Sequence, residues 1–464
     1  MIETMKPLVR APAALLLALA LGPALPGAAE PPASSPPAAA DLPVDRIPDS
    51  SDLRGRYWSG FFSAPPRSAS RAPALVRGAS GDFRFSTVDG SEYFYQIVSP
   101  LPAGAAAGAS VPLYAQGTWI LKRAKKNGAP VQAKVFLRSD PGCFARLYPD
   151  GDRSRVDLVV YGGLLCREVA LPLPFDRAFA SSFGDIVRWT SGVVDWTLLS
   201  PRPDDYAALR GFVAAMRERL PSLRYVDDGA LDAEGRPVYI ATGKPQVGPP
   251  GLNCSGFAKW VVDGFYRPLA GRGLDPRAMA ARHDDTRLNS FARPFETELD
   301  PYFGLDWNRN LALALADAED PERGHDLFES DVSDAPFALF AAEPPTGAVN
   351  GSSTYVDYPA PDRDLGYEGR GLKSLLYVLA ARDPDAIYLA SLSRRGGGPV
   401  AGLLRHYHVA VLAPYFDEAG AFRTAVFESA AETSLDSLVA RLGKDFVHLV
   451  RIPLLPDFAP AVIR

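Results

Sequence analysis

Short segments of alternating apolar and polar residues dominate the chain from about residue 51 to residue 202. The segments are rich in β-branched and aromatic residues, and clusters of Gly, Pro and Asp separate them. This pattern is typical of short β-strands joined by turns. We therefore predict a mainly β N-terminal domain at residues 51–202, built as a sandwich or a barrel. The clearest strands are expected at residues 93–98, 117–121, 132–137 and 155–161.

A helical period replaces the alternation after residue 202, which indicates a second domain at residues 203–464. Apolar residues three and four apart predict one helix from Tyr206 to about Leu220 and another that begins after Asn253. Their apolar faces consist of Leu209, Phe212, Val213 and Met216, and of Phe257, Trp260, Val261 and Phe265. Residues 271–365 are acidic, irregular and rich in Pro and Gly. We interpret them as an insertion that forms a lid or one wall of a cleft.

Two strand-like segments, His406–Ala413 and Phe422–Ser429, flank a turn-like sequence and predict an antiparallel hairpin. A hairpin centred near residue 418 places His408 directly opposite Glu428, where the two side chains can meet. His406 is expected on the same face as His408, and a register slip of one residue would turn Glu428 away.

The first residues predict export. Residues 1–29 combine Lys6 and Arg10 with a short apolar run and small residues at the end, as in a cleaved signal peptide. Residues 30–50 are rich in Pro, Ala and Ser and predict a solvated linker. No later segment is apolar and long enough to span a bilayer. We therefore expect a periplasmic or secreted protein without a transmembrane segment after signal removal.

Composition and charge set only broad limits. The 464 residues suffice for two or three domains, and the formal net charge is −5. No block of like charges stands out, so nothing indicates a nucleic-acid partner. Nothing in the sequence requires a cofactor.

Cys254 is the candidate for chemistry. A thiol in the first turn of a helix feels unpaired amides and the positive end of the helix dipole, which favours the reactive thiolate. Asn253 can cap this helix, and Gly256 leaves room beside the sulfur. The alternative is a buried structural cysteine, a common fate of a free thiol.

The other cysteines bear on this choice. Cys143 and Cys166 lie in one strand-rich segment and could form a disulfide, which would leave Cys254 as an odd, reactive thiol in an exported protein. His408 is then the preferred base, with His406 as its competitor. Glu428 would orient the imidazole as the third member of a triad. A zinc site at His406 and His408 lacks an evident third ligand, so we predict no metal.

These residues resemble the NlpC-type cell-wall cysteine peptidases, which have a papain-like fold. In that family a Tyr and a Gly-bearing loop lead into an Asp-Cys-Ser-Gly-aromatic motif. Here Tyr239 and Gly243 precede the sequence Asn253–Phe257, with Asn253 in place of the usual Asp. The sequence His408–Leu412 is similar to the family's His strand, and Val426–Ser429 to the strand of its third residue.

The resemblance implies an α+β fold with a papain-like cysteine hydrolase domain behind the mainly β domain. It implies Cys254 as nucleophile, His408 as base and Glu428 as orienting residue. Tyr239, Asn253 and Ser255 are the candidate substrate-binding residues.

The expected activity is cleavage of an amide bond, with the peptide of peptidoglycan as the implied substrate and partner. Another cell-envelope polymer is the alternative partner. One alternative function is an amidase or acyltransferase that acts on another substrate with the same residues. The other is a non-catalytic envelope protein that uses the papain-like domain as a binding scaffold.

Overall fold

The computed structural model describes residues 42–65, 74–102, 112–283, 300–333, 338–339, 363–395 and 404–463. The predicted signal peptide lies outside these residues, and so does the linker up to residue 41. No helix in the described part of the chain is long and apolar enough to cross a membrane.

The N-terminal module is one antiparallel sheet with the strand order β1-β2-β3-β4-β5-β6-β7-β8-β11. The strands are β1 Ala74–Gly78, β2 Gly81–Asp89, β3 Tyr93–Pro100, β4 Trp119–Ala124, β5 Pro130–Phe136, β6 Cys143–Asp150, β7 Arg153–Val160, β8 Gly163–Leu171 and β11 Ala338–Leu339. The four strands expected from the alternating pattern correspond to β3, β4, β5 and β7, so these predictions are confirmed. Among the described residues, the order runs between two edge strands, β1 and β11, as in an open sheet, rather than forming the two sheets of a sandwich or a closed barrel.

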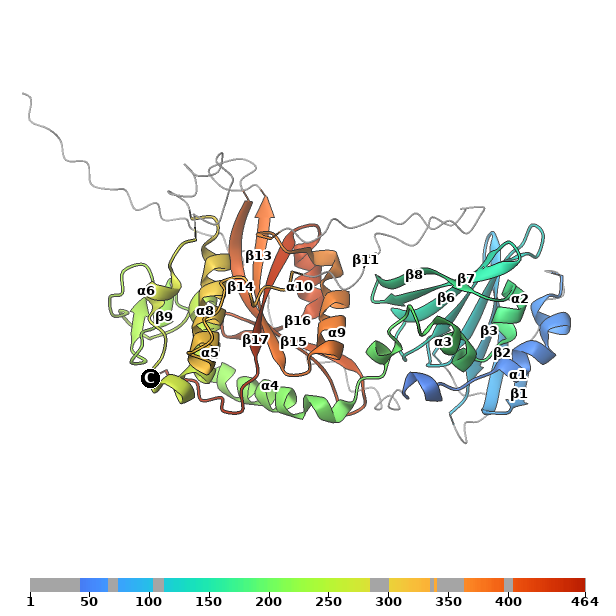
Figure 1. The fold of residues 1–464 in the computed structure, drawn as a ribbon, viewed down its shortest axis with the longest axis horizontal. Coiled ribbons are helices and arrows are strands. Elements are labelled where there is room, and N and C mark those ends of the chain that lie inside the picture. The colour runs from blue at the N-terminus through green and yellow to red at the C-terminus, as the bar shows by residue number, and fades with distance from the viewer. Residues whose placement is uncertain are drawn as a thin grey trace, which may run out of the picture. The chain divides into compact units, whose positions relative to one another are not determined.

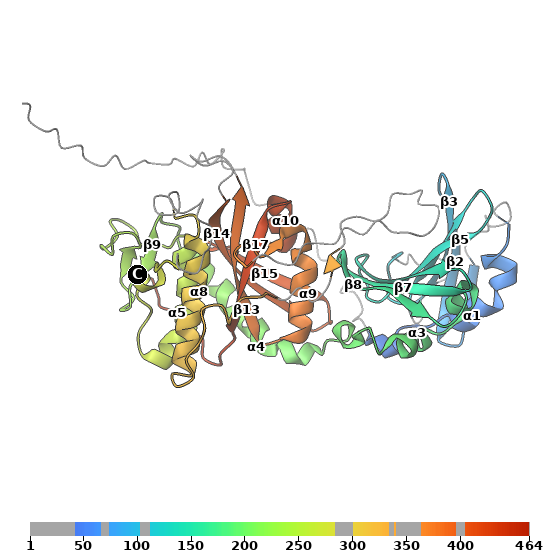
Figure 2. The ribbon, with the colours of Figure 1, turned by 45° about the horizontal axis from the view of Figure 1, so that its top comes forward.

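Helical segments cover one face of this sheet, which the prediction of a mainly β domain did not include (Figures 1 and 2). They are the 3-10 turn η1 Val44–Arg46, α1 Ser51–Arg56, the π-helical turn η2 Trp58–Phe62, α2 Phe175–Ala180, α3 Phe183–Thr190 and the 3-10 turn η4 Trp196–Leu199. Aromatic rings join them to the strands: the Phe179 ring lies 5.0 Å from Phe62 and 5.6 Å from Trp119, between centroids. These segments, which precede β1 or follow β8, bury their apolar side chains here because an exposed apolar sheet face is costly.

The end of the predicted linker belongs to this module. Val44 and Ile47 are buried in its core, and the Leu42 amide donates to Gln116 Oε1 at 2.8 Å. Residues 42–50 are therefore anchored to the module through Val44, Ile47 and Ser50, although Leu42, Pro43, Asp45 and Arg46 remain exposed. Two apolar residues spaced among prolines give no periodic signal, which explains the misplaced boundary.

The suggested disulfide between Cys143 and Cys166 is absent, and both are free cysteines. Cys143 lies on β6 and Cys166 on β8, with β7 between them. Two strand spacings amount to about 9–10 Å, too far for a disulfide. The odd-cysteine argument for Cys254 therefore fails, and its case rests on geometry alone.

The C-terminal domain is built on a six-stranded antiparallel sheet with the order β12-β17-β13-β14-β15-β16. Its strands are β12 Tyr367–Glu368, β13 Ala386–Arg395, β14 Leu404–Phe416, β15 Phe422–Glu428, β16 Ala431–Ser434 and β17 Phe446–Pro453. A two-stranded sheet of β9 Gly229–Leu231 and β10 Pro237–Tyr239 precedes it.

Helices lie on both faces of this sheet. They are α4 Ala207–Arg219, α5 Cys254–Ala270, α6 Pro276–Met279, α8 Phe303–Glu319, α9 Leu372–Arg382 and α10 Leu435–Leu442, with the 3-10 turns η5 Pro203–Tyr206, η6 Leu220–Ser222 and η8 Gly369–Gly371. Figure 1 shows α5 and α8 on one side of the strands and α9 and α10 on the other. Alternate residues of β14 follow this division: Val409 and Val411 pack in the core with α5 and α8, whereas Ala410 and Leu412 pack with α9 and α10.

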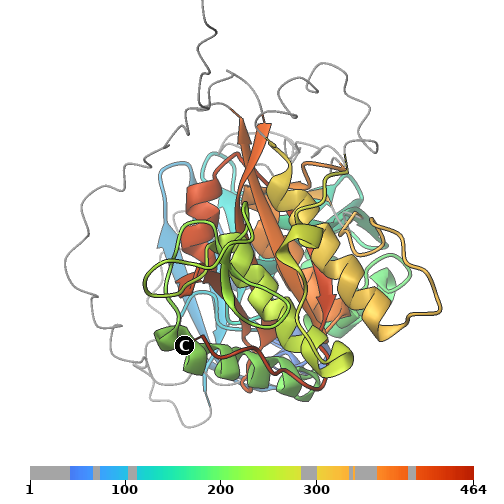
Figure 3. The same cartoon turned by 90° about the vertical axis from the view of Figure 1, so that its left-hand side faces the viewer.

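Aromatic contacts tie the two helices of the sequence prediction to the end of the chain. Phe458 lies 4.9 Å from the rings of both Phe212 in α4 and Phe265 in α5. The Trp260 indole donates to Ala461 O at 2.8 Å, and Figure 3 shows this last segment beside α4 and α5. Both predicted helices are confirmed with the predicted buried faces.

The prediction that residues 271–365 form an insertion is wrong for α8, which is a core helix packed on α5. Trp307 is fully buried, and its indole donates to Ser255 O at 2.9 Å. The side chains of residues 304–312 are nearly all buried, so the helix has no polar face from which a period could be recognised. Its buried polar residues are paired, for example Asn308 with the Ser391 hydroxyl at 2.8 Å.

Candidate active site

Backbone pairing fixes the peptide that precedes Cys254. The Leu252 amide donates to Arg224 O at 2.9 Å, and its carbonyl accepts from Val226 at 3.3 Å. The next amide, that of Asn253, donates to Gly229 O at 2.9 Å. The thiol is therefore placed by a rigid connection before its helix begins.

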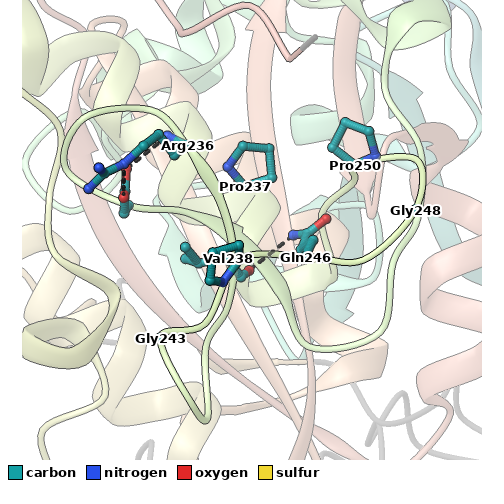
Figure 4. Close-up of a pocket in the computed structure, with 9 residues that line it drawn as sticks. Arg236, Pro237, Val238, Gly243, Gln246, Gly248 and Pro250 are labelled. Atoms are coloured by element: carbon teal, nitrogen blue, oxygen red, sulfur yellow. Dashed lines mark hydrogen bonds and ion pairs between the residues drawn. The ribbon is translucent and has the colours of Figure 1, made fainter.

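Gln246 adds a side-chain clamp to the same connection. Its Oε1 accepts from the Gly251 amide at 2.9 Å, and its Nε2 donates to Gly251 O at 2.9 Å and to Val238 O at 3.0 Å. Figure 4 shows Gln246 and Val238 in a surface hollow formed by this loop. The residues that line the hollow do not include Cys254, His408 or Glu428, so it is separate from the candidate site.

Asn253 caps α5, as its sequence position predicts. Its Oδ1 accepts from the Gly256 amide at 2.7 Å, and Cys254 is the first residue of the helix. Gly256 has a different purpose from the one expected. A Cβ there would lie 2.0 Å from Gly229 O, so glycine allows β9 to approach the helix and does not open space at the sulfur.

Cys254, His408 and Glu428 form a continuous chain of contacts from α5 through β14 to β15. The His408 Nε2–H donates to Glu428 Oε1 at 3.0 Å. His408 also interacts with the Cys254 thiol, because the imidazole lowers the pKa of the thiol and the thiol raises the pKa of the imidazole. A thiol, an imidazole and a carboxylate thus follow one another in the order that nucleophilic catalysis requires.

The hairpin differs from its predicted register by two positions. The ladder pairs Val411 with Phe427, so Glu428 continues opposite residue 410 instead of His408. A shift of two keeps the side chains on the same face, and a diagonal neighbour is still within reach of long side chains. The contact that was expected between directly opposed residues is therefore a diagonal one.

His406 does not share the face of His408. A β-bulge at Tyr407 leaves Leu392 paired with His408 and Ser393 with His406, which reverses the alternation at this point. His406 Cβ lies close to Gly304 of α8, its Nε2–H donates to Asp364 O at 2.8 Å, and its side chain is buried. His406 thus contacts α8 and Asp364, whereas His408 interacts with the thiol and with Glu428.

The environment of the three residues favours a thiolate and an imidazolium. Burial by itself would raise the pKa of the Cys254 thiol, but the hydrogen bond and charge of His408, the Val409 amide and the Ser255 hydroxyl outweigh it, and the pKa is lowered. Burial also opposes the charged form of His408. Hydrogen bonds and negative charge from Cys254 and Glu428 nevertheless raise the pKa of its imidazole to about 9.

The Glu428 carboxyl is ionised at neutral pH. Burial would raise the pKa of its carboxyl, but hydrogen bonds from His408, Arg441 and Thr433 lower it to about 2. Arg441 Nη2 lies 2.6 Å from both carboxylate oxygens, and the Thr433 hydroxyl donates to Oε2 at 2.6 Å. The sequence prediction missed both donors, although the apolar residues Leu435, Leu438 and Leu442 indicate the amphipathic helix that carries Arg441.

The three candidate substrate-binding residues have other neighbours. The Tyr239 hydroxyl accepts from the Val247 amide at 3.3 Å, and Asn253 is the helix cap. Ser255 is 3% exposed, which keeps it from substrate. Tyr225 instead lies beside the thiol: it forms a bridge with Leu252, and the pKa of its phenol is raised by burial and by the charges of Asp227 and Cys254. A single bridge leaves no periodic trace in the sequence, so Tyr225 was not predicted.

Within the described ranges, no group of three or more His, Cys, Asp or Glu side chains is arranged to hold a metal ion. His448 is buried, and its Nε2 lies 3.3 Å from Asp331 Oδ2.

Comparison with known proteins informs only the N-terminal module. The family model described as "Domain of unknown function (DUF8515)" matches residues 43–198. No curated protein and no solved structure matches the chain. Cys254, His408 and Glu428 lie outside the matched residues, so their function has to be argued from geometry.

Proposed function

We propose that the C-terminal domain is a papain-like cysteine hydrolase that cleaves an amide bond in a compartment outside the cytoplasm. The observation that carries the proposal is the chain of interactions from Cys254 through His408 to Glu428, in which His408 donates to Glu428 at 3.0 Å and lowers the pKa of the Cys254 thiol. A protein that only binds its partner has no need of a thiolate held against an imidazolium, so the chain favours an enzyme over a binding scaffold.

The first half of the reaction forms an acyl-enzyme. The Cys254 thiolate attacks the amide carbonyl carbon, and the carbonyl oxygen takes up the negative charge. The Cys254 amide is in the first turn of α5, where amides have no partner within the helix, so it is placed to donate to that oxygen. The His408 imidazolium then gives its proton to the departing amine, and the C–N bond breaks.

The second half restores the enzyme. Neutral His408 takes a proton from water while the water oxygen attacks the thioester carbon. Collapse of this intermediate releases the carboxylic acid and returns the thiolate and the imidazolium. Glu428 keeps the ring oriented throughout and stabilises its charged form.

The substrate class comes from the resemblance to the NlpC-type peptidases, which points to the peptide part of peptidoglycan. Two exposed aromatic residues near the triad support an extended substrate. Tyr225 is 59% exposed beside the thiol, and Tyr407, next to His408, is 40% exposed. Such rings can form the walls of a cleft because they give contact area at low entropic cost.

The test is a digestion of purified peptidoglycan with the mature protein, followed by mass analysis of released fragments. We expect peptides cleaved at one kind of amide bond, and no release by Cys254→Ser, because a hydroxyl of similar size is a far weaker nucleophile. Equal release by the purified Cys254→Ser protein would contradict the mechanism. Intact peptidoglycan with a Cys254 that still reacts quickly with thiol probes would instead direct the search to another amide or acyl substrate.

A further inference from the structure

The position of Glu428 makes its carboxylate difficult to fix. It is the last residue of β15, and Ser429 and Ala430 after it adopt left-handed backbone conformations with φ of 47° and 73°. The chain reverses there into β16, with Glu428 opposite Ala431. A long side chain at the end of a strand has several rotamers, so its direction has to come from its neighbours.

Arg441 is the first of these neighbours. It projects from the last turn of α10, which Ser434 caps by accepting from the Ser437 amide at 3.1 Å. The guanidinium donates to Oε1 and Oε2 of Glu428 at 2.6 Å each, although half of the Arg441 side chain is exposed.

Thr433 is the second. It pairs with Val426 across the β15–β16 ladder, which puts its side chain on the face of Glu428. Its hydroxyl donates to Oε2 at 2.6 Å. Oε1 therefore receives His408 and Arg441, and Oε2 receives Arg441 and Thr433, which uses the four acceptor positions of a carboxylate.

We propose that Arg441 and Thr433 are positioning residues that fix the Glu428 carboxylate in the direction from which it receives the His408 ring N–H. The inference rests on the proposed function, because it assigns these two residues a purpose only within the triad. Arg441 and Thr433 approach the Glu428 carboxylate from α10 and β16. Their hydrogen bonds therefore do not compete with the one that Oε1 accepts from His408.

A purely electrostatic effect of Arg441 would have the opposite sign. A cation near His408 disfavours the imidazolium, so removing its charge alone would raise the pKa of His408. Loss of positioning weakens the bond to Glu428 and lowers that pKa. The charged groups that act on the imidazole are Cys254 on α5 and Glu428 on β15, and neither is replaced in the variant. Arg394 and Asp445 act on the neighbouring Tyr407, and they are unchanged too.

The experiment is a titration of His408 by NMR in the full chain, with the resonance assigned by its loss in His408→Ala. In Arg441→Gln we expect the midpoint to fall by about 0.3–0.7 pH unit, the shift that corresponds to a half-exposed ion pair. Alkylation of Cys254 at neutral pH should be about two- to fivefold slower for the same reason. Thr433→Val, which removes only the hydroxyl donor, should shift the midpoint in the same direction.

Arg217→Gln is the matched control. Arg217 pairs with Glu432 on β16, the strand that carries Thr433. The Arg217 side chain is 50% exposed, and that of Arg441 is 51% exposed. The control should leave the His408 midpoint unchanged. A midpoint that rises or stays constant in Arg441→Gln and Thr433→Val would overturn the positioning role. If the wild-type His408 already titrates near its ordinary value of 6.5, the proposed ion pair itself fails, and with it the proposed function.

Discussion

At the scale of single residues, one bulge separates two histidines that the sequence places side by side. Tyr407 is left out of the β13–β14 ladder, so the His406 ring approaches α8 and the His408 ring approaches the thiol. Period-two alternation cannot foresee this, because a bulge depends on the partner strand and not on the strand that contains it.

This difference predicts unequal effects of two similar substitutions. His408→Ala removes the proposed general base and should lower kcat/KM by about 10²–10⁴-fold. His406→Ala removes a buried ring outside the triad, so it should affect stability more than the chemical step. The comparison requires kcat/KM and thermal unfolding of both variants. An inactive His406→Ala beside an active His408→Ala would reverse the assignment.

The charge of Glu428 gives a second prediction, in the pH dependence. Because Glu428 helps to raise the pKa of His408 to about 9, the imidazolium persists to alkaline pH in the wild type. Glu428→Gln keeps a hydrogen-bond acceptor and loses the charge. The alkaline limb of the pH–rate profile should therefore move down toward 6.5, with partial activity below it. An unchanged alkaline limb would show that Glu428 does not act on the imidazole.

At the scale of elements, the contact between β9 and α5 depends on a missing side chain. A Cβ at Gly256 would meet backbone and not a flexible side chain, so helix or strand would have to move. Gly256→Ala should destabilise the protein by about 1–3 kcal/mol, the usual cost of overpacking, and displace the thiol.

Gly211 is the control for Gly256. It lies on the exposed side of α4, and no atom lies within 4 Å of a Cβ added there. Gly211→Ala should stabilise the protein by about 0.5–1 kcal/mol through helix propensity. Denaturant unfolding of both variants decides the question, and equal stabilities would mean that β9 adapts to the added methyl group.

The elements that the sequence predicted well share one property. In the helices α4 and α5 the large apolar residues recur at helical spacing, so their period is visible in the sequence, even though α5 is buried on all sides from residue 255 to residue 265. The helix α8 is buried nearly all round and contains paired polar residues, so it has no such period. The hairpin centre was misplaced by one residue, and the predicted contact survived only because the resulting shift was even.

At the scale of the whole molecule, the site residue found from a local sequence signal differs from those that were missed, which reach the site through contacts between separate segments. Cys254 was found because a helix start and its cap are contiguous in sequence. Arg441 reaches the site from a following helix, Thr433 through a diagonal strand pair, and Tyr225 through a single bridge. Such contacts depend on tertiary packing, and no pattern in the chain encodes them at short range.

The three cysteines provide the references for the decisive measurement. Burial raises the pKa of Cys143 to about 12, and burial also raises the pKa of Cys166. Only Cys254 has a lowered pKa, which makes it the one thiol that should remain reactive at neutral pH.

The most direct test of the central claim is the rate of iodoacetamide alkylation at each cysteine as a function of pH, read by peptide mass spectrometry. We expect Cys254 to titrate below the ordinary value of 9.0 and to react well ahead of Cys143 and Cys166. In His408→Ala its midpoint should move upward, because the charge that stabilises the thiolate is gone. A Cys254 midpoint at or above 9.0 that is the same in both proteins would contradict the thiolate–imidazolium pair and the hydrolase built on it.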